Sequence, residues 1–524
     1  MASSMASTIR LGEYNWVRAS HSDFLRVLAF VVAGLAYAAP QTGRTEKGLE
    51  LARGGDLKAA ETELRAAVAL APNDPDALAT LGSVLGMEHR LEEADTYLER
   101  ALRIEPANLV VRRNLAAGQW QLGRLREAAT NLVRVLKAKP GDPPTVLLLG
   151  MVKENQKDYA RAAELLASVP ELARQRTESI AALARSYYRT GRKGKAKDTL
   201  EYALKPPLDA QAVLLCGDIA SLEGDSETAL KLFDSIRGAY PDKNALTYSM
   251  ALAQFRGGHF REAEDQLLTL SGSAPTSGSY SLLAWCYFRQ RKFQEAVRAM
   301  DLAIDLDPRK ESNYLDLGRM LTDHDLLVVA RAVTLKAVQE LPDSFRAYML
   351  KGLVEAKQGD LAAAVVSYRR AVALNPDAPE PNYNLAKMQS LAGMDKEAQE
   401  TFERGMRKFP KDARTCQEYA LVQMRRAENG IESAEASAVS LFQRAISLDN
   451  ALWEPHYQLG NLWLAKGRTV EAVKELETAL TLNRKEAEIH FALSRAYRRS
   501  GGQERASVEL AAYEELKAHP EKPD

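Results

Sequence analysis

The chain has 524 residues, too many for one compact hydrophobic core and enough for several domains or one long array of repeats. It is 46% hydrophobic and 27% charged, a composition that excludes a disordered polymer. Its 70 Lys and Arg residues balance 70 Asp and Glu residues, so the chain has no general electrostatic attraction for phosphate backbones or anionic lipid. We therefore expect no nucleic-acid partner.

The N-terminal segment has the pattern of a secretory signal. Residues 27–36 form a short apolar run after Arg26, and Ala36 and Ala38 are the small residues that a signal peptidase reads. A permanent membrane helix needs about twenty apolar residues, so we expect a signal peptide at 1–38, export, and no integral membrane span after cleavage. The style of the signal favours the bacterial periplasm over the extracellular space. A membrane anchor through residues 27–36 is the alternative.

From residue 41 onward the sequence repeats itself with a period of 34 residues, varied by two steps of 33 and one of 40. From the second repeat on, a small residue stands twelve positions before every recurring alanine except Ala438, and a proline stands twelve positions after most of them. A fixed period of this length indicates a repeat architecture. The recurring alanines are Ala60, Ala94, Ala128, Ala162, Ala196, Ala229, Ala263, Ala296, Ala330, Ala364, Ala398, Ala438, Ala472 and Ala506.

Each repeat predicts a hairpin of two short helices. In the second repeat Leu78, Leu81 and Leu85 fall at helical spacing before a polar turn, and Leu91 and Leu98 follow it. The proline after the second helix ends it, because proline lacks the N–H donor and clashes with the preceding turn. The small residues allow the two helices to approach closely. A single hairpin cannot bury its own apolar face, so we expect successive hairpins to stack into one continuous core.

These positions resemble the tetratricopeptide repeat consensus over residues 41–520, in about fourteen units. The resemblance implies an all-α fold, an α-solenoid in which tandem helix-turn-helix repeats form a right-handed superhelix. Two series carry the resemblance most fully: Leu81-Gly82, Leu85, Ala94, Leu98, Ala101 and Pro106 in one unit, and Tyr280, Ala284, Tyr287, Ala296, Ala303 and Pro308 in another.

We divide the chain into a signal peptide (1–38), an N-terminal array of about seven repeats (39–276), a C-terminal array of about seven repeats (277–520) and a tail (521–524). About six extra residues in the twelfth unit predict a longer loop between its helices near 427–433. The Gly/Ser-rich segment 271–281 predicts a softer joint between the two arrays.

Signatures of catalysis are missing from the sequence. It contains no GxGxxG, Walker loop, HExxH or GxSxG motif, so we expect no enzymatic activity and no cofactor. Residues 191–195 resemble a phosphate loop in composition only. His456 and His490 lie 34 residues apart at equivalent positions, where packing is favoured over a metal pair. The three cysteines form no CxxC pair and are expected to be buried, inert thiols: Cys216, Cys286 and Cys416.

The remaining candidate site is a surface. In tetratricopeptide arrays the first helix of each unit lines the concave face of the superhelix. The side chains that point into this groove stand three positions before, one position after and four positions after the small residue of that helix. These positions hold Tyr248, Leu252 and Phe255 in the seventh unit, and Trp285 and Phe288 in the eighth. We predict an apolar groove patch there. The alternative, that some of these rings pack between units, stays open.

Further along the chain the same positions become mixed and more basic. They could receive an acidic or carboxylate-bearing segment, while scattered solvated charges remain the alternative. The basic clamp that some family members use for C-terminal peptides is not reproduced in register, and the asparagine ladder of glycosyltransferase-linked arrays is reduced to Asn114 and Asn384. The residues at the mixed positions are Arg319, Tyr383, Lys387, Tyr457, Asn461 and Arg495.

Together these features predict a non-enzymatic scaffold for protein–protein interaction, which binds a peptide or protein partner in the concave groove and acts in envelope assembly or secretion. Two alternatives stay open. One is a regulatory or substrate-recruiting subunit of an enzyme complex, and the other is a structural spacer that associates with its own copies. The sequence does not distinguish a peptide from a folded protein or a glycan as the ligand.

Overall fold

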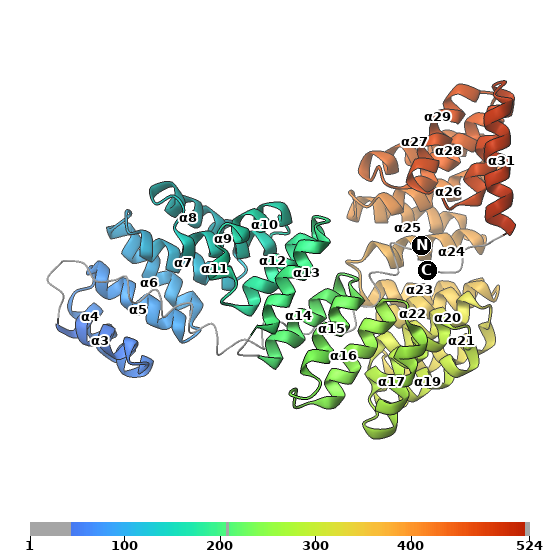
Figure 1. Cartoon of the computed structure of the whole chain (residues 1–524). Coiled ribbons are helices and arrows are strands. Elements are labelled where there is room, and N and C mark those ends of the chain that lie inside the picture. The colour runs from blue at the N-terminus through green and yellow to red at the C-terminus, as the bar shows by residue number, and fades with distance from the viewer. Residues whose placement is uncertain (1–42, 206–208, 519–524) are drawn as a thin grey trace. The chain divides into compact units, whose positions relative to one another are not determined.

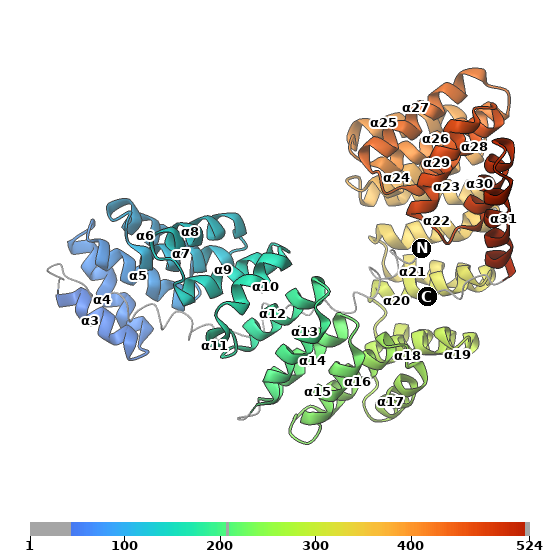
Figure 2. The same cartoon turned by 45° about the horizontal axis from the view of Figure 1, so that its top comes forward.

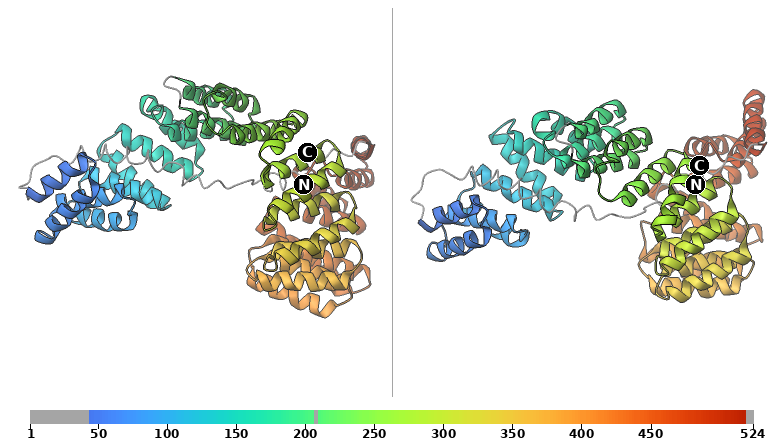
Figure 3. Two further views of the ribbon diagram at one scale, coloured as in Figure 1. Left: turned by 90° about the horizontal axis from the view of Figure 1, so that it is seen from below. Right: turned by 60° about the horizontal axis from the view of Figure 1, so that its bottom comes forward.

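The computed structural model describes residues 43–205 and 209–518. The predicted signal peptide, the alternative anchor and the C-terminal tail lie outside the described residues. The chain divides into two compact units, Met1–Pro275 and Thr276–Asp524, and we describe each by itself. Within each unit, helices follow one another side by side in chain order (Figure 1), as two further directions of view also show (Figures 2 and 3).

The described part of the first unit is helical and contains no strand. Its helices form seven successive hairpins, with a short extra turn after the fourth and a 3₁₀ turn, η1, after the fifth. In chain order they are α3 (Gly43–Arg53), α4 (Leu57–Leu70), α5 (Pro75–Met87), α6 (Leu91–Ile104), α7 (Leu109–Gln121), α8 (Leu125–Ala138), α9 (Pro143–Asn155), α10 (Tyr159–Ala167), α11 (Pro170–Ala173), α12 (Thr177–Arg189), α13 (Lys193–Leu200), η1 (Glu201–Leu204), α14 (Ala210–Leu222), α15 (Ser226–Ile236), α16 (Lys243–Arg256) and α17 (Phe260–Ser273).

The second unit repeats the same hairpin seven times within its described residues. Its even-numbered helices are the first helices of each hairpin and its odd-numbered helices are the second. In chain order they are α18 (Ser277–Arg289), α19 (Phe293–Leu306), α20 (Glu311–Asp323), α21 (Leu327–Glu340), α22 (Phe345–Lys357), α23 (Leu361–Leu374), α24 (Pro379–Leu391), α25 (Asp395–Lys408), α26 (Ala413–Glu428), α27 (Glu432–Leu448), α28 (Trp453–Ala465), α29 (Thr469–Leu482), α30 (Ala487–Arg499) and α31 (Gln503–Ala518).

Local sequence sets the ends of these helices. The carboxylate of Asp74 accepts hydrogen bonds from the backbone N–H groups of Asp76 and Ala77, and so caps the first turn of α5. Helix α28 ends before Gly467, whose φ of 74° belongs to the left-handed region that favours glycine. Caps and stops of this kind recur with the repeat, which explains why the helices of successive hairpins have nearly equal lengths.

The small residues stand where the two helices of a hairpin touch. A Cβ atom on Gly82 would lie 2.8 Å from Cγ of Leu98, and one on Gly460 would lie 2.6 Å from Cγ of Leu476. Ala296, one of the recurring alanines, is 1% exposed. The all-α solenoid expected from the period is therefore present, and close helix contact accounts for the small side chains.

The expectation of a longer loop in the twelfth unit is wrong. The twelfth unit has no long loop at 427–433, because its extra residues lengthen both helices: α26 has 16 residues and α27 has 17, and only Asn429–Ile431 separates them. Gly430 supplies the helix stop with a φ of 91°. In the Gly/Ser-rich segment 271–281, α17 runs to Ser273 and Thr276 forms a capping box with Ser279 at the start of α18. The boundary between the two compact units lies between them, after Pro275, and a softer joint there stays a prediction.

No helix in residues 43–205 or 209–518 is both long enough and apolar enough to cross a bilayer.

Candidate partner-binding surface

The first helices of the second unit each carry an accessible side chain directly after the small residue. We call this set the inner row. Apart from Leu353 and Arg495, which are exposed, its members are half-buried. Apolar and polar or cationic side chains alternate along most of the row. Its residues are Trp285, Arg319, Leu353, Lys387, Leu421, Asn461 and Arg495, on α18, α20, α22, α24, α26, α28 and α30.

A second position on the same helices, four residues earlier, is also accessible in most hairpins and is apolar or aromatic. Because residues i and i+4 lie on one face of a helix, these side chains stand beside the inner row. Ser281 and Gln417 are the buried exceptions. The accessible members are Leu315, Met349, Tyr383, Tyr457 and Phe491, of which Phe491 is 42% exposed.

Trp285 is tied to the next hairpin. Its indole N–H donates a hydrogen bond of 3.3 Å to the Oδ2 atom of Asp316 on α20. Asp316 is buried, and loss of solvation raises its pKa to about 6, against the opposing effects of Trp285 and of the nearby Arg319 cation. Trp285 therefore offers only part of its ring to a ligand.

Phe288 does not line an open surface. Its ring is 8% exposed and packs edge-on against Trp285, with 5.6 Å between the ring centroids. The rings of Phe293 on α19 and His324 at the end of α20 lie at 5.8 and 5.3 Å from it. Phe288 thus follows the alternative left open for these rings, packing between units.

The seventh-unit residues belong to the first compact unit. Phe255 is 5% exposed and packs edge-on against Phe260, 5.4 Å away between centroids, so it also is a core side chain. Tyr248 and Leu252 on α16 remain half-buried. Since Trp285 belongs to the other compact unit, a shared apolar patch of the seventh and eighth hairpins stays a prediction.

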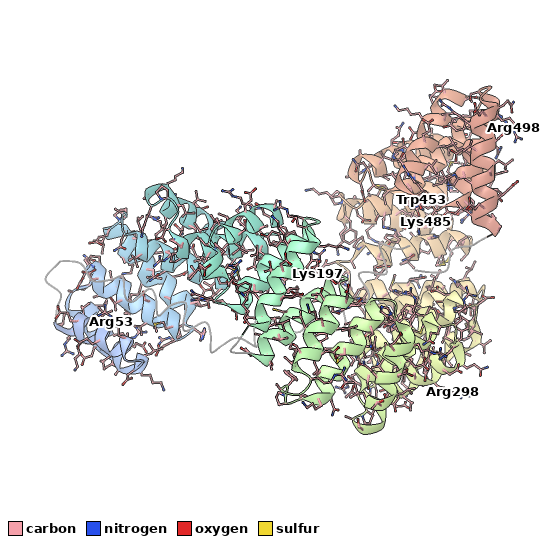
Figure 4. All side chains as sticks on the ribbon, in the orientation of Figure 1. Arg53, Lys197, Arg298, Trp453, Lys485 and Arg498 are labelled. Carbon is pink, nitrogen blue, oxygen red and sulfur yellow. The ribbon has the colours of Figure 1, made fainter. Side chains whose placement is uncertain are left out.

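The basic members of the inner row have neighbours of their own. Nζ of Lys387 lies 3.1 Å from a carboxylate oxygen of Glu418 on α26, which leaves it partly neutralised. The guanidinium carbon of Arg495 lies 6.0 Å from the ring centroid of Phe491. Arg498, labelled in Figure 4, is exposed on the same helix. Positive charge is therefore most available at α30.

The aromatic members of the mixed positions are partly covered. Burial raises the pKa of Tyr383 far above its usual range, so its phenol stays protonated. The ring of Tyr457 lies 6.1 Å from that of Trp453, the residue labelled in Figure 4 at the start of α28. Asn461 is half-buried one turn further along α28. These side chains can offer hydrogen bonds and ring faces to a ligand.

The two equivalent histidines form a repeated polar contact that sequence reasoning missed. Nδ1 of His456 lies 2.6 Å from Oε2 of Glu475, and Nδ1 of His490 lies 2.6 Å from Oε2 of Glu509. Both glutamates follow their histidines by 19 residues, so the offset was visible in the sequence. Among the described residues, no group of three or more His, Cys, Asp or Glu is arranged to hold a metal ion.

One small cavity lies in the first unit. A cavity of about 10 Å³ lies between α5, α6 and α7, beside Gly82, Ser83 and Asn114, and this is about the size of one water molecule. The three cysteines are buried as expected. Burial raises the pKa of Cys216 to about 12 and raises that of Cys416, so neither is a reactive thiolate.

Comparison with known families identifies repeats along the chain. Models described as "Tetratricopeptide repeat" match residues 45–108, 119–183, 181–244 and 248–311. A model described as "TPR repeat" matches residues 352–393.

Curated relatives match parts of the chain. Human protein O-mannosyl-transferase TMTC1 is 28% identical over 214 residues, which are 40% of this chain and 24% of that protein. The mouse protein of the same name is 25% identical over 214 residues, or 40% and 23% of the two chains. The cell division cycle protein 27 homolog of Caenorhabditis elegans is 31% identical over 118 residues, or 22% and 15%. The chain thus spans about a quarter or less of each relative.

Solved structures resemble the chain at low sequence identity. Yeast Tom70 is 16% identical with a TM-score of 0.43, covering 84% of this chain and 92% of that one. The APC/C hetero-tetramer Cut9-Hcn1 is 16% identical with a TM-score of 0.35, covering 95% and 96%. Naa15/Naa10 bound to HypK-THB is 15% identical with a TM-score of 0.37, covering 93% and 95%.

Proposed function

Because the chain belongs to the tetratricopeptide repeat family, we propose that it is a non-enzymatic scaffold that binds a protein or peptide partner along the inner row of its second unit. The observation that carries this proposal is the composition of that row and the position beside it. Tyr, Phe, Trp, Met and Arg, the residue types enriched at protein interfaces, remain accessible there on successive helices.

The chemistry of the row indicates the kind of partner. Leu353 and Leu421 offer apolar contact between the cationic side chains of Arg319, Lys387 and Arg495. A segment that presents apolar side chains together with carboxylates matches this alternation. Because Lys387 already has Glu418 beside it, we expect the carboxylates of the partner to be held chiefly near Arg495, where the positive charge is most exposed.

A second candidate function rests on the curated relatives. One curated relative, matched over 214 residues, is named as an O-mannosyl-transferase, of which the chain spans 24%. The corresponding role for this chain is a substrate-recruiting or regulatory part of an enzyme complex, in which a partner carries the catalytic residues. It would use the same inner row, and the identity of the captured partner separates it from a scaffold without enzymatic associates.

We further propose that the chain is exported after cleavage behind Ala38 and works in the bacterial periplasm, in envelope assembly or secretion. The pattern of residues 26–38 supports this proposal. Mass spectrometry of the protein purified from a cell envelope tests it, since the mature chain would begin at Ala39. A chain that keeps residues 27–36 and sediments with membranes would favour the anchored form instead.

The binding proposal is tested by affinity capture with paired variants. Tyr457→Ala combined with Arg495→Ala removes two side chains from adjacent first helices. Val470→Ala combined with Lys474→Ala is the matched control, because both residues are exposed on α29, the second helix between them. Interface tyrosines and arginines often contribute more than 1 kcal/mol each, so we expect at least about a tenfold loss of affinity in the first variant.

A partner that is retained by the control and by the wild type, and lost by the Tyr457/Arg495 variant, supports the proposed function. Equal retention by both variants contradicts the assignment of the inner row. Circular dichroism of each variant checks that helical content is unchanged, because Tyr457 also packs against the core of its hairpin.

A further inference from the structure

The outer face of α21 is unusually apolar for a second helix. Val328 is 82% exposed, Leu335 is 49% exposed and Val329 is 43% exposed. The first turns of α21 and α23 contain no acidic residue, whereas those of α19, α25, α27 and α29 all do. Ala332, between Val328 and Leu335, is exposed as well. Residues 328, 332 and 335 fall on one face of a helix, so they form a continuous apolar strip.

The two neighbouring second helices carry opposite charges. Asp301 and Asp305 are exposed on α19, and Nζ of Lys336 on α21 lies 3.0 Å from Oδ1 of Asp305, which joins the outer faces of the two helices. Arg369 and Arg370 are exposed on α23. Since second helices of successive hairpins lie next to one another in a solenoid, the apolar strip has an acidic flank and a basic flank.

The repeat period places these side chains at matching heights. Ala296, Ala330 and Ala364 are equivalent positions of α19, α21 and α23, so Asp301, Leu335 and Arg369 lie at one level along the three helices. One turn nearer the N-terminus, Arg298, which is labelled in Figure 4, has Ala332 and Val366 as its equivalents. Val366 is 63% exposed and extends the apolar strip onto α23.

The acidic flank and the basic flank are complementary to each other in one orientation. In a face-to-face pair the two-fold axis lies in the plane of contact. An axis perpendicular to the helices would set α19 against α19 and oppose the two acidic flanks. An axis parallel to α21 instead sets α19 against α23 of the second copy, at the same level, so that Asp301 meets Arg369 and Leu335 meets Leu335.

We propose that a second copy of this chain docks on the outer face of α21, about a two-fold axis parallel to that helix, with Asp301 of each copy facing Arg369 of the other. Lys336 then approaches its own counterpart, and its ion pair with Asp305 offsets the like charge. The inner row takes no part in this contact, so dimerisation and partner binding on the first helices are independent.

The surface area that the two copies can bury sets the expected affinity of the dimer. Three helices of about 14 residues, each rising about 1.5 Å per residue and spaced about 10 Å apart, present about 600 Å² per copy. The two copies would bury about 1,200 Å² in total, the lower limit of specific interfaces. We therefore expect a reversible dimer that forms in the micromolar range.

Sedimentation equilibrium of the full chain from about 1 to 100 µM tests the proposal. The expected result is a shift from monomer to twice the monomer mass over this range, abolished by Val328→Glu. Val470→Glu is the matched control, because Val470 is 79% exposed at the equivalent position of α29, and it should leave dimerisation unchanged. A monomer at every concentration, or a dimer that survives Val328→Glu, would overturn the proposal.

Charge reversal tests the orientation. Asp301→Arg alone and Arg369→Asp alone should each weaken dimerisation about tenfold or more, because each creates two like-charge contacts in the symmetric pair. The variant that carries both changes restores both contacts and should recover most of the wild-type affinity. Additive weakening in the double variant would contradict the parallel two-fold axis.

Discussion

Trp285 donates its indole N–H to the buried carboxylate of Asp316 across 3.3 Å, and so links the first helices of two successive hairpins. This contact leaves the indole only partly available to a ligand. It also places a carboxylate with a pKa of about 6 inside the second unit.

Asp316 should make stability depend on pH. Its pKa rises from 3.8 to about 6 on folding, so the folded chain keeps a proton that the unfolded chain has released. The resulting stabilisation is present below about pH 4 and is lost as the pH rises to 6. This rise in pKa corresponds to a change of at most about 3 kcal/mol in the free energy of unfolding. The Asp316→Asn variant has no proton to lose at this position. We therefore expect its free energy of unfolding, compared with that of the wild type, to be about 1–3 kcal/mol higher at pH 7.5 than at pH 4.

Urea unfolding of both proteins at the two pH values measures this difference. The control is Asp323→Asn, which changes an exposed carboxylate on the same helix. A difference between wild type and Asp316→Asn that stays constant with pH would contradict the buried, proton-retaining state of Asp316.

Ala296→Leu should destabilise the eighth hairpin. Ala296 is 1% exposed at the contact between the two helices, and extra methylene groups in a packed core typically cost about 1–3 kcal/mol. Thermal unfolding should therefore begin at a lower temperature. Ala373→Leu makes the same change at an exposed position of α23 and should have little effect. Equal melting curves for the two variants would show that the repeat register is wrong.

The buried pair of His490 and Glu509 should contribute measurably to the end of the array. The two side chains lie 2.6 Å apart, and His490 is 9% exposed. Glu509→Ala removes the partner of Nδ1 and leaves the contact of Nε2 with the backbone oxygen of Arg484, so we expect a loss of about 1–2 kcal/mol in the free energy of unfolding. Glu515→Ala, an exposed change on the same helix, is the control. If Glu509→Ala lowers the free energy of unfolding no more than Glu515→Ala does, the contact between His490 and Glu509 contributes no more than an exposed side chain.

The cysteines should be unreactive in the folded chain. Cys216, Cys286 and Cys416 are 0%, 0% and 2% exposed, and burial raises the pKa of Cys216 and Cys416. A chromogenic aromatic disulfide, which reacts with accessible thiols, should label none of the three cysteines within minutes under native conditions. It should label all three in denaturant. Rapid labelling of the folded chain would indicate opening of a first helix.

The fold was predictable because its causes are local and repeated. Glycine at 82 and 460 already implied a close helix contact, and the period of 34 residues required stacked hairpins. The length of each helix was less predictable, since the six extra residues near 427–433 could lengthen a loop or two helices. The helix-forming residues before Asn429 and the stop at Gly430 decided this locally.

The candidate surface was predictable only in part. Helical periodicity identifies which residues share a face, but the covering of Phe288 comes from Phe293 and His324 on two other helices. The same limit applies to Trp285, whose partner lies 31 residues away. By contrast, the pairing of His456 with Glu475 could have been found, because the same offset of 19 residues recurs one repeat later in His490 and Glu509.

Site-specific photocrosslinking in cells can show whether a partner binds along the first helices of the second unit. A photoreactive amino acid replaces Asn461 on the inner row or, as the control, Lys474 on the outer surface of the same hairpin. We expect a discrete crosslinked protein from position 461 and none of that mass from position 474. Adducts of equal yield at both positions, or at position 474 alone, would contradict it.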